Sequence, residues 1–533
     1  MNRSDHVVIV GGGSSGWMTA ASLSRFFPKK KITVIESPDV PRIGVGESTL
    51  EHFTFFIKSI GVDPEDLFRY CDATYKFSIK FNNFYKQGDG GFHYPFGESS
   101  HKSPIFNKFG LEAWQYLKWK YPDLQNSHYA ESYYPVLALC NNSTININEN
   151  RELDNFNFRV SYAYHFDANM FANFLHEKVC VPRGVNYIPG TVVSVNQNEY
   201  GIESVTLDSG DVIDGDLFID CTGFKNVLLK ELGAEWMDYS DIIPNNRAWA
   251  ARVPYTDVKK QMECYTNCTA LGNGWVWNTP TWSRLGTGYV YSDRYTTPEL
   301  ALMEFKNHLE ANGYKSSDLN FRDLHFRVGM QKEVWKKNCV AIGLSAGFIE
   351  PLESTGLYTT ITFVNRLVET LNYEGFNQYQ IHQYNTVCRA DYDGLAKFTA
   401  SHYMYTQRED TQYWKDCRLR DYNAHLVPHE RVMPQTQYNS DYFSQEIMSA
   451  KYFTYRFSNA GGSHCILAGC NQTVLNDLKI LKDDYYRNGP SIKQLNMILP
   501  DMLEKVNRRI SEWNKVARSS ESHYDYLMRR FHS

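Results

Sequence analysis

Residues 7–17 read Val-Val-Ile-Val-Gly-Gly-Gly-Ser-Ser-Gly-Trp, a β-branched run followed by a glycine cluster and the start of a helix-forming stretch. The glycines give the pattern G-x-G-x-x-G between a predicted strand and a predicted helix. In this pattern Gly11 permits a tight turn, Gly13 lets a pyrophosphate approach the backbone, and Gly16 allows close packing of helix on strand. The candidate cofactor-binding residues of this turn are Gly11, Gly13, Ser14, Ser15, Gly16 and Trp17.

The next predicted strand, residues 31–35, ends at Glu36, an acid placed where a ribose hydroxyl can donate to it. A glycine string alone is a weak signal, because a glycine-rich structural turn gives the same letters. The order strand, glycines, helix, strand and acid is much more specific. It predicts an α/β dinucleotide-binding fold, and Glu36 joins the candidate cofactor contacts.

Composition bounds the class of protein. The chain has 533 residues, too many for one hydrophobic core, so two modules are expected. Aromatic residues make up 15% of the chain and include 37 tyrosines, which suits either a pocket for flat, electron-rich molecules or simply a large core. The net charge of −5 gives no sign of a surface for nucleic acid or an anionic membrane.

The cysteines indicate the compartment. Eleven are scattered along the chain without a C-x-x-C pair, which favours reduced thiols and argues against a zinc or other metal site. The chain runs from Met1 into the first strand without a signal peptide, and no apolar run is long enough to span a membrane. We therefore expect a cytoplasmic protein.

Further elements follow in chain order. The glycine-rich loop 41–49 can lie flat against a ligand, although an ordinary strand-to-helix connection is the alternative. Residues 74–81 alternate as a strand would, with one lysine-bearing face and one apolar face. From about residue 82 to 158 few periodic runs occur, which predicts an inserted loop region with short helices.

Strands predicted later in the chain are expected beside the first βαβ unit. Residues 216–223 read as a buried strand ending in a glycine turn, suited to a second contact with the same dinucleotide. An antiparallel platform is expected over residues 246–292. Residues 338–344 form one more apolar strand, which leads to a helix ending near Leu371 and adds two cofactor candidates, Gly343 and Leu344.

Several motifs occur in a characteristic order along the chain. They are the turn ending in Trp17, residues 41–47, Phe77–Phe81 after Lys76, His165-Phe166-Asp167-Ala168, Trp275-x-Trp277-x-x-Pro280 and Leu352-Glu353-Ser354-Thr355-Gly356. The W-x-W-x-x-P motif following a flavin fingerprint is specific. With these motifs the chain resembles the flavin-dependent tryptophan halogenase family over most of its length.

The resemblance implies a fold and a chemistry. It implies an FAD-binding, Rossmann-like three-layer module with an antiparallel β platform over residues 1–372, and a mainly helical module over residues 373–533 that caps the substrate. In the family, reduced FAD from a separate NAD(P)H-dependent flavin reductase reacts with O2 to a hydroperoxide. A halide ion attacks this species to give hypohalous acid, which travels through the protein to a lysine beside a small aromatic substrate.

Two catalytic residues follow from motif position. Lys76 falls where the family's lysine lies, and a positioned ammonium or haloamine can direct an otherwise indiscriminate oxidant. On the residues alone, a strand lysine is more often a solvated charge, and Lys80 is a second lysine on the same predicted face. Glu353 matches the family's glutamate, suited to polarising the lysine and taking the ring proton. Its alternative is a helix N-terminal acid that pairs with the helix dipole.

Motif position also assigns the halide and flavin contacts. Thr355 and Gly356 begin a helix, so free backbone amides and the positive end of the helix dipole can hold a halide. Trp275 and Trp277 fall near the flavin in the family and wall it off from organic substrates, although such a pair is otherwise more often core. The candidate FAD contacts of the glycine-rich loop are Arg42, Gly44, Val45, Gly46 and Glu47.

The substrate region departs from the family pattern. In residues 92–97, Phe96 matches a family aromatic, whereas Tyr94 stands where a family histidine is expected. The opposing family tryptophan has no clear counterpart around residues 455–462, and Thr279 replaces an isoleucine. We therefore expect an electron-rich aromatic of indole or phenol type rather than strictly free tryptophan, with chloride, bromide and iodide all open. The candidate substrate contacts are Phe96, Tyr94 and Ser354.

The leading hypothesis is a two-component FAD-dependent halogenase with a small aromatic substrate and a separate reductase as partners. A flavin-dependent aromatic hydroxylase is the second hypothesis, because the same fold can pass oxygen directly to a substrate. A non-catalytic flavin-binding or interaction protein is the third. Whether the chain forms a homo-oligomer is left open by the sequence.

Overall fold

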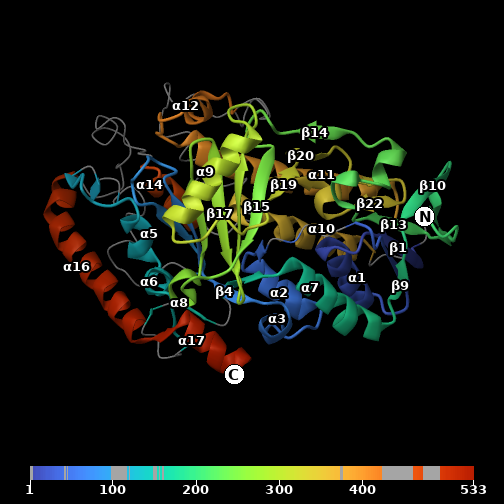
Figure 1. The fold of residues 1–533 in the computed structure, drawn as a ribbon, viewed down its shortest axis with the longest axis horizontal. Helices are drawn as coiled ribbons and strands as arrows, with labels where there is room; N and C mark the ends of the chain where they lie inside the picture. The colour runs from blue at the N-terminus through green and yellow to red at the C-terminus, as the bar shows by residue number, and fades with distance from the viewer. Residues whose placement is uncertain are drawn as a thin grey trace.

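The computed structural model describes residues 4–40, 44, 46–97, 114, 117–118, 120–147, 153–154, 156–158, 161–371, 376–422, 460–471 and 492–533. Figure 1 shows the N-terminal strands and helix α1 toward one end of the molecule, a large antiparallel sheet in the middle, and the C-terminal helix α16 (Ile492–Ser519) along the far edge. The predicted division into modules at residue 372 stays a prediction.

A six-stranded sheet carries the dinucleotide-binding turn. Its inner strands are apolar and buried, as the run Val7–Val10 shows, which is typical of a parallel sheet covered on both faces. All neighbours pair in parallel except β21 with β22. In spatial order the strands are β21 (Trp335–Lys336), β22 (Cys339–Ala341), β13 (Leu217–Asp220), β1 (His6–Val10), β2 (Lys31–Glu36) and β9 (Asn186–Pro189).

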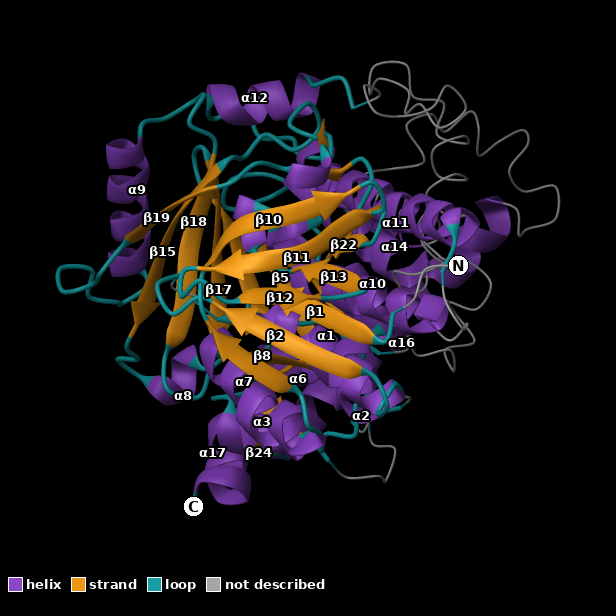
Figure 2. Cartoon of the chain, turned by 90° about the vertical axis from the view of Figure 1, so that its right-hand side faces the viewer, coloured by secondary structure: helices purple, strands orange, loops and turns teal. Residues whose placement is uncertain are grey.

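Two further layers cover this sheet. Figure 2 shows the small sheet of β10 (Val192–Asn198), β11 (Gly201–Leu207) and β12 (Val212–Asp214) on one side. Helices α1 (Ser14–Phe26) and α10 (Thr355–Leu371) lie on the other side. The predicted three-layer α/β fold is confirmed. The strand predicted at 338–344 is shorter than expected, because the chain turns into a 3-10 helix at Gly343–Ser345.

The predicted antiparallel platform is part of a larger, seven-stranded sheet in the middle of the molecule (Figure 1), in which one pair of neighbouring strands is parallel and the others are antiparallel. Helix α9 (Pro298–Ala311) packs on it through Ala301, Phe305 and Leu309. In spatial order the strands are β19 (Arg322–His325), β15 (Arg247–Val253), β18 (Leu285–Tyr291), β17 (Gly274–Pro280), β16 (Thr266–Ala270), β5 (Ser78–Asn82) and β6 (Phe92–Pro95).

The single strand predicted over residues 74–81 is wrong. The chain forms β4 (Thr74–Lys76), which pairs with β8 (Ala163–Phe166), and then β5, which pairs with β16 and β6. It passes from one sheet to the other at Phe77, whose amide donates to the Cys264 carbonyl oxygen at 2.8 Å. Because both faces are covered, no solvated lysine-bearing face exists, and of residues 74–81 only Lys80 is not buried.

Shorter elements surround these sheets. In the first half of the chain they are α2 (His52–Ser59), α3 (Glu65–Tyr70), α5 (His128–Tyr133), α6 (Val136–Asn142), α7 (Ala168–Phe174), α8 (Val258–Gln261), β3 (Glu47–Ser48), β7 (Thr144–Ile145) and β14 (Trp236–Asp238). The second half adds β20 (Gly329–Gln331), β23 (Gly347–Phe348), α11 (Gln378–Met404), α12 (Gln412–Leu419), α14 (Ala460–Gly469), β24 (Glu521–Ser522) and α17 (His523–Leu527). The described chain beyond residue 376 is mostly helical, as predicted.

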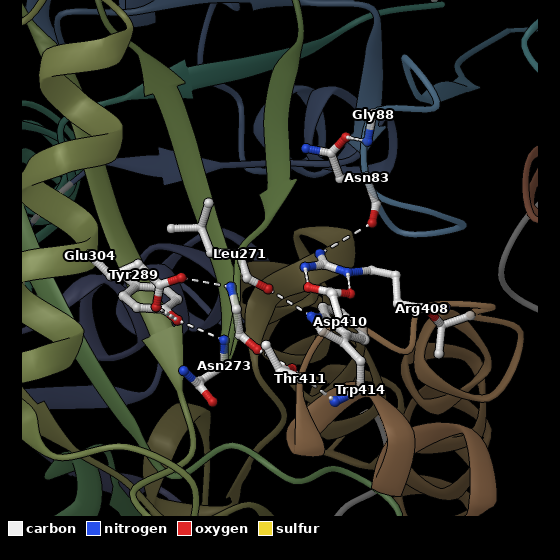
Figure 3. A network of polar contacts seen from close by, with 12 residues as sticks. Asn83, Gly88, Leu271, Asn273, Tyr289, Glu304, Arg408, Asp410, Thr411 and Trp414 are labelled. Atoms are coloured by element: carbon white, nitrogen blue, oxygen red, sulfur yellow. Dashed lines mark hydrogen bonds and ion pairs between the residues drawn. The ribbon is translucent and has the colours of Figure 1, made fainter.

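A polar network fixes the end of α11 and the start of α12 on the platform (Figure 3). The buried Arg408 pairs with Asp410 at 2.6 Å and donates to the Asn83 carbonyl oxygen at 3.3 Å. Thr411 and Trp414 donate to backbone carbonyl oxygens in the turn between β16 and β17, both at 2.6 Å. The last turn of α11 is therefore held against the sheet that carries β5.

All eleven cysteines are buried free thiols. None of the helices in the described part of the chain combines the length and the apolar character needed to cross a membrane.

Candidate active site

The glycine turn has the geometry expected of a dinucleotide site. Gly11 has φ +116°, and a Cβ there would lie 2.2 Å from the Cys221 carbonyl oxygen. A Cβ on Gly16 would lie 1.9 Å from the Gly11 carbonyl oxygen, so α1 packs directly on the turn. A Cβ on Gly13 would meet nothing within 4 Å. The space beside Gly11 is thus filled by protein backbone, whereas the space beside Gly13, at the N-terminus of α1, is open.

The other predicted residues of this turn take different positions. Ser14 and Ser15 are the first residues of α1, whose early amides have no partner within the helix. The Glu36 carboxyl lies beside Gly12, where a Cβ would come 2.0 Å from its carboxyl carbon. Trp17 is fully buried and stacks on His176 with ring centroids 4.2 Å apart, so its side chain serves packing within the module.

The 3-10 helix that follows β22 meets the same turn. Gly343 has φ +73°, and a Cβ there would lie 2.7 Å from the Ser15 hydroxyl and Cβ. Leu344 follows it in the 3-10 helix. The structure therefore brings together the glycine turn, Glu36 and the Gly343–Leu344 pair, which are far apart in sequence.

The glycine-rich loop reaches the platform. Arg42 and Val45 lie outside the described residues. The Gly44 carbonyl oxygen accepts from Arg252 Nη2 at 2.6 Å, and Gly46, with φ +120°, lies against Thr279 of β17. Burial and then the charge of Asp167 raise the pKa of Glu47 to about 7. The described residues of this loop thus contact the platform through Arg252 and Thr279.

Lys76 is fully buried, with 0% of its side chain exposed. Its Nζ donates to the Thr49 carbonyl oxygen at 2.8 Å and to Ser354 Oγ at 2.7 Å, and lies 5.0 Å from the centre of the Phe96 ring. Burial lowers the pKa of Lys76 to about 7, and the Glu353 carboxylate partly offsets this effect. Burial thus favours the uncharged form of this amine.

A chain of hydroxyls continues from Lys76 into the protein. Ser354 Oγ donates to Ser48 Oγ at 3.0 Å, which contacts Thr266 Oγ1 at 2.6 Å. Thr266 Oγ1 lies 2.9 Å from Nε2 of the buried His165. Burial, followed by the charge of Lys76, holds the pKa of His165 well below its ordinary value. The imidazole therefore stays neutral beside the lysine.

Glu353 is 1% exposed and precedes α10 in a 3-10 helix, Pro351–Glu353. Its Oε1 lies 2.7 Å from Nε2 of His402, which is 0% exposed on α11, without a hydrogen bond of ordinary angle. Burial raises the pKa of Glu353, while His402 and then Lys76 act in the opposite direction. The carboxyl is therefore buried beside His402 and within the electrostatic influence of Lys76 rather than exposed at a helix end.

A second buried carboxyl, Glu350, lies one turn earlier. It accepts from Tyr403 and, at 2.7 Å, from Asn245 Nδ2. Burial raises the pKa of Glu350 to about 7. Its hydrogen bonds join the same loop to α11 and to the chain entering β15. Sequence reasoning missed this network and His402, because neither belongs to a motif.

The start of α10 has the form of an anion site. Ser354 adopts a left-handed conformation with φ 58°, and the helix begins at Thr355. Thr355 Oγ1 is buried without a hydrogen-bond partner, and a Cβ on Gly356 would meet nothing within 4 Å. The predicted halide residues thus provide an unused hydroxyl, free amides and open space.

Of the predicted substrate residues, Phe96 and Ser354 lie beside Lys76, and Tyr94 packs on Phe96. Phe96 and Tyr94 are buried at the end of β6, with their rings edge to face at 6.5 Å, and Tyr94 contacts Phe398 of α11 at 6.0 Å. Ser354 bonds Lys76 directly. Of the stretch 455–462, residues 455–459 lie outside the described residues, so the expected lack of a counterpart to the family tryptophan stays a prediction.

Trp275 and Trp277 share one face of β17, with ring centroids 6.2 Å apart. Trp275 is fully buried in the main core, whereas Trp277 is partly buried and packs over Gly288. Their predicted place beside a flavin stays a prediction.

Comparisons with known proteins agree with these features. The family model "Tryptophan halogenase" matches residues 6–454. The tryptophan 6-halogenase ThaL of Streptomyces albogriseolus is 30% identical over 100% of this chain and 99% of its own. The tryptophan 7-halogenase RebH of Lentzea aerocolonigenes is 32% identical over 87% of this chain and 89% of its own. The apo structure of VirX1 matches with TM-score 0.88 and 35% identity, covering 100% of both chains. The chain therefore belongs to the tryptophan halogenase family of flavin-dependent enzymes.

Proposed function

We propose that the protein is a two-component FAD-dependent halogenase that delivers hypohalous acid through Lys76 to an electron-rich aromatic substrate. The observation that carries this proposal is the fully buried lysine with a pKa near 7, bonded to Ser354 at the start of α10 and electrostatically coupled to Glu353. A buried amine of this kind needs a function, because burying an ionisable lysine without one is costly.

The residues around the glycine turn fit FAD. The open space at Gly13 and the free amides of Ser14 and Ser15 suit a pyrophosphate, and the Glu36 carboxyl beside Gly12 suits a ribose hydroxyl. Reduced FAD, supplied by a separate NAD(P)H-dependent reductase, would provide together with O2 the oxidising equivalents that convert a halide to hypohalous acid. The other proposed contacts are Gly44, Gly46, Glu47, Gly343 and Leu344.

Thr355 and Gly356 are the proposed halide contacts. The unpartnered Thr355 hydroxyl and the amides at the start of α10 donate toward the open space at Gly356. Chloride, bromide and iodide can all accept such hydrogen bonds.

Lys76 positions the oxidant and Glu353 removes the proton. As a neutral amine, Lys76 can take the halogen from hypohalous acid, whose oxygen leaves as water with the proton released from the amine; as an ammonium, it can donate a hydrogen bond to hypohalous acid. Glu353 then accepts the proton released from the ring carbon. The Phe96 ring, 5.0 Å from Lys76 Nζ, supports an aromatic environment beside this lysine.

The proposed substrate class is an indole or phenol type of aromatic. ThaL and RebH are named for tryptophan. In this chain Tyr94 packs on Phe398 where the family pattern has a histidine, which supports a substrate other than strictly free tryptophan.

The test is turnover of an indole and phenol panel with FAD, a flavin reductase, NADH and a halide, read by mass spectrometry. We expect halogenated products that disappear when the halide is omitted. Oxygen insertion that persists without halide would instead identify a hydroxylase. FAD binding without turnover of any aromatic would favour the non-catalytic alternative.

A further inference from the structure

We infer that His402 is a positioning residue for the proton-transfer step: it holds the Glu353 carboxyl in the form and orientation that accepts the ring proton. The inference rests on the proposed function and adds to it a residue that no motif of this chain includes. It is carried by the contact between two fully buried side chains from separate elements, the turn before α10 and the last turn of α11.

The His402 ring is enclosed by aromatic groups. Phe81 of β5 lies at 4.7 Å between ring centroids and Phe398 at 5.6 Å, and Phe84 completes the enclosure at 6.3 Å. The side chain is 0% exposed, so solvent water does not compete for its nitrogens. The only ionisable group within bonding distance of the ring is the Glu353 carboxyl, among the residues the structure describes.

The partners of the two His402 ring nitrogens indicate where hydrogens lie in this pair. Nδ1 faces the carbonyl oxygens of Phe398 at 3.2 Å and Thr399 at 3.3 Å, which only accept hydrogen bonds, so Nδ1 carries a hydrogen. Nε2 and Glu353 Oε1 are 2.7 Å apart, too close for two lone pairs to face each other. The contact is off the ordinary hydrogen-bond angle, so the pair holds at least one proton, on the imidazole or on the carboxyl.

The second proton site that His402 offers gives the carboxyl its capacity as a base. Burial favours a protonated Glu353, which could not accept another proton alone. With His402 as partner, the carboxyl is either ionised beside an imidazolium or passes its own proton to Nε2 as it accepts a new one. Both routes end with a protonated carboxyl beside an imidazolium. Lys76, Glu350 and the buried thiol of Cys268 also face this pair.

Transfer of the ring proton to Glu353 changes no oxidation state. After halogen addition, the attacked ring carbon carries both the halogen and its original hydrogen. The C–H bond breaks, its electron pair returns to the ring, and the proton moves to the carboxyl of Glu353. His402 touches neither the substrate nor the halogen, so its effect is transmitted through Glu353 alone.

The position of His402 is held from both sides. Tyr403, the next residue, donates to Glu350, and the Arg408 network that follows α11 is anchored on the platform (Figure 3). Tyr403→Phe is therefore a matched control. It breaks the neighbouring buried carboxylate contact on the same helix turn and leaves the His402–Glu353 pair in place.

The experiment compares single-turnover rates for an aromatic substrate with hydrogen or deuterium at the halogenated carbon, in separate reactions with saturating halide. In the parent we expect no isotope effect, because proton loss is fast. In His402→Phe, proton loss becomes limiting: the rate falls on the order of 10²-fold and an isotope effect appears, as in Glu353→Gln. His402→Gln, which can still donate to Glu353 but cannot take up its proton, should also show the isotope effect.

Tyr403→Phe should show no isotope effect even if its stability falls. A His402→Phe enzyme that binds FAD and halogenates without an isotope effect would overturn the inference. If His402→Phe does not fold, a His402→Gln enzyme that binds FAD and halogenates without an isotope effect would overturn it instead. A parent that binds FAD but makes no halogenated product would instead remove the proposed function on which the inference rests. The two failures are therefore distinguishable.

Discussion

The glycine turn and the group of residues around Lys76, here called the lysine centre, are assembled in opposite ways. The turn is local: residues 6–36 supply the strand, the glycines, the helix and the acid in one continuous unit. The lysine centre draws Lys76 from β4, Thr49 from the loop after β3, Ser354 from the turn before α10 and His402 from α11. A local unit can be recognised from the amino-acid sequence, whereas a site formed by residues distant in sequence exists only in the folded chain.

The two lysines of residues 74–81 give the sharpest test of this comparison. Lys76→Ala should lower aromatic halogenation by about 10²–10⁴-fold while FAD still binds, because the positioned amine is lost. Lys80→Ala is the matched control, since Lys80 is partly exposed above Tyr265 and should keep the parent rate. Product formation by mass spectrometry and FAD binding by fluorescence check both. Equal losses in the two variants would remove the distinction.

Two glycines of the turn separate folding from cofactor binding. Gly13→Ala should weaken FAD binding about tenfold, because a methyl group enters the open space above the helix N-terminus, while the midpoint of thermal unfolding barely changes. Gly11→Ala should destabilise the fold itself, since its Cβ would collide with the Cys221 carbonyl oxygen at a positive φ. Flavin titration and thermal denaturation distinguish them, and a Gly13→Ala enzyme with parent affinity would contradict the site.

The burial of Lys76 should appear in the pH dependence of stability. Its pKa is near 7 in the folded protein and 10.5 in the unfolded chain, so between these values the unfolded chain binds more protons. The parent's free energy of unfolding therefore gains up to about 1.4 kcal/mol per pH unit from this residue as pH rises. Lys76→Met has no ionisable group at this position. The free energy of unfolding of the parent should therefore increase relative to that of Lys76→Met from pH 7 toward pH 10. A constant difference in urea unfolding would show that Lys76 is not desolvated.

The smallest expected effect concerns the halide. Thr355→Val removes the unpartnered hydroxyl without changing the shape of the side chain, and one lost hydrogen bond of about 1 kcal/mol should raise the KM for halide roughly fivefold. Maximal turnover and the KM for the aromatic substrate should stay unchanged. A rise confined to the aromatic substrate would instead place the hydroxyl in the substrate pocket.

The sequence could predict the three-layer fold, the platform and the geometry of the glycine turn, because strand periodicity and glycine spacing are local properties. It could not choose Lys76 over Lys80 from the residues, since a period of two puts both on one face. The choice depends on the change of sheet at Phe77, which buries one lysine and leaves the other partly exposed. His402 carries no sequence signal, because its role arises from the packing of α11 against the turn before α10.

The most direct measurement separates making the oxidant from delivering it. The reaction is run with reduced FAD, O2, a halide, the aromatic substrate and a diffusible scavenger of hypohalous acid such as taurine. For Lys76→Ala we predict loss of the halogenated aromatic with halogenated scavenger still formed, and for Gly13→Ala a decrease in both at limiting FAD. Continued halogenation of the aromatic at one ring position by Lys76→Ala would contradict the account, as would loss of both products with FAD bound.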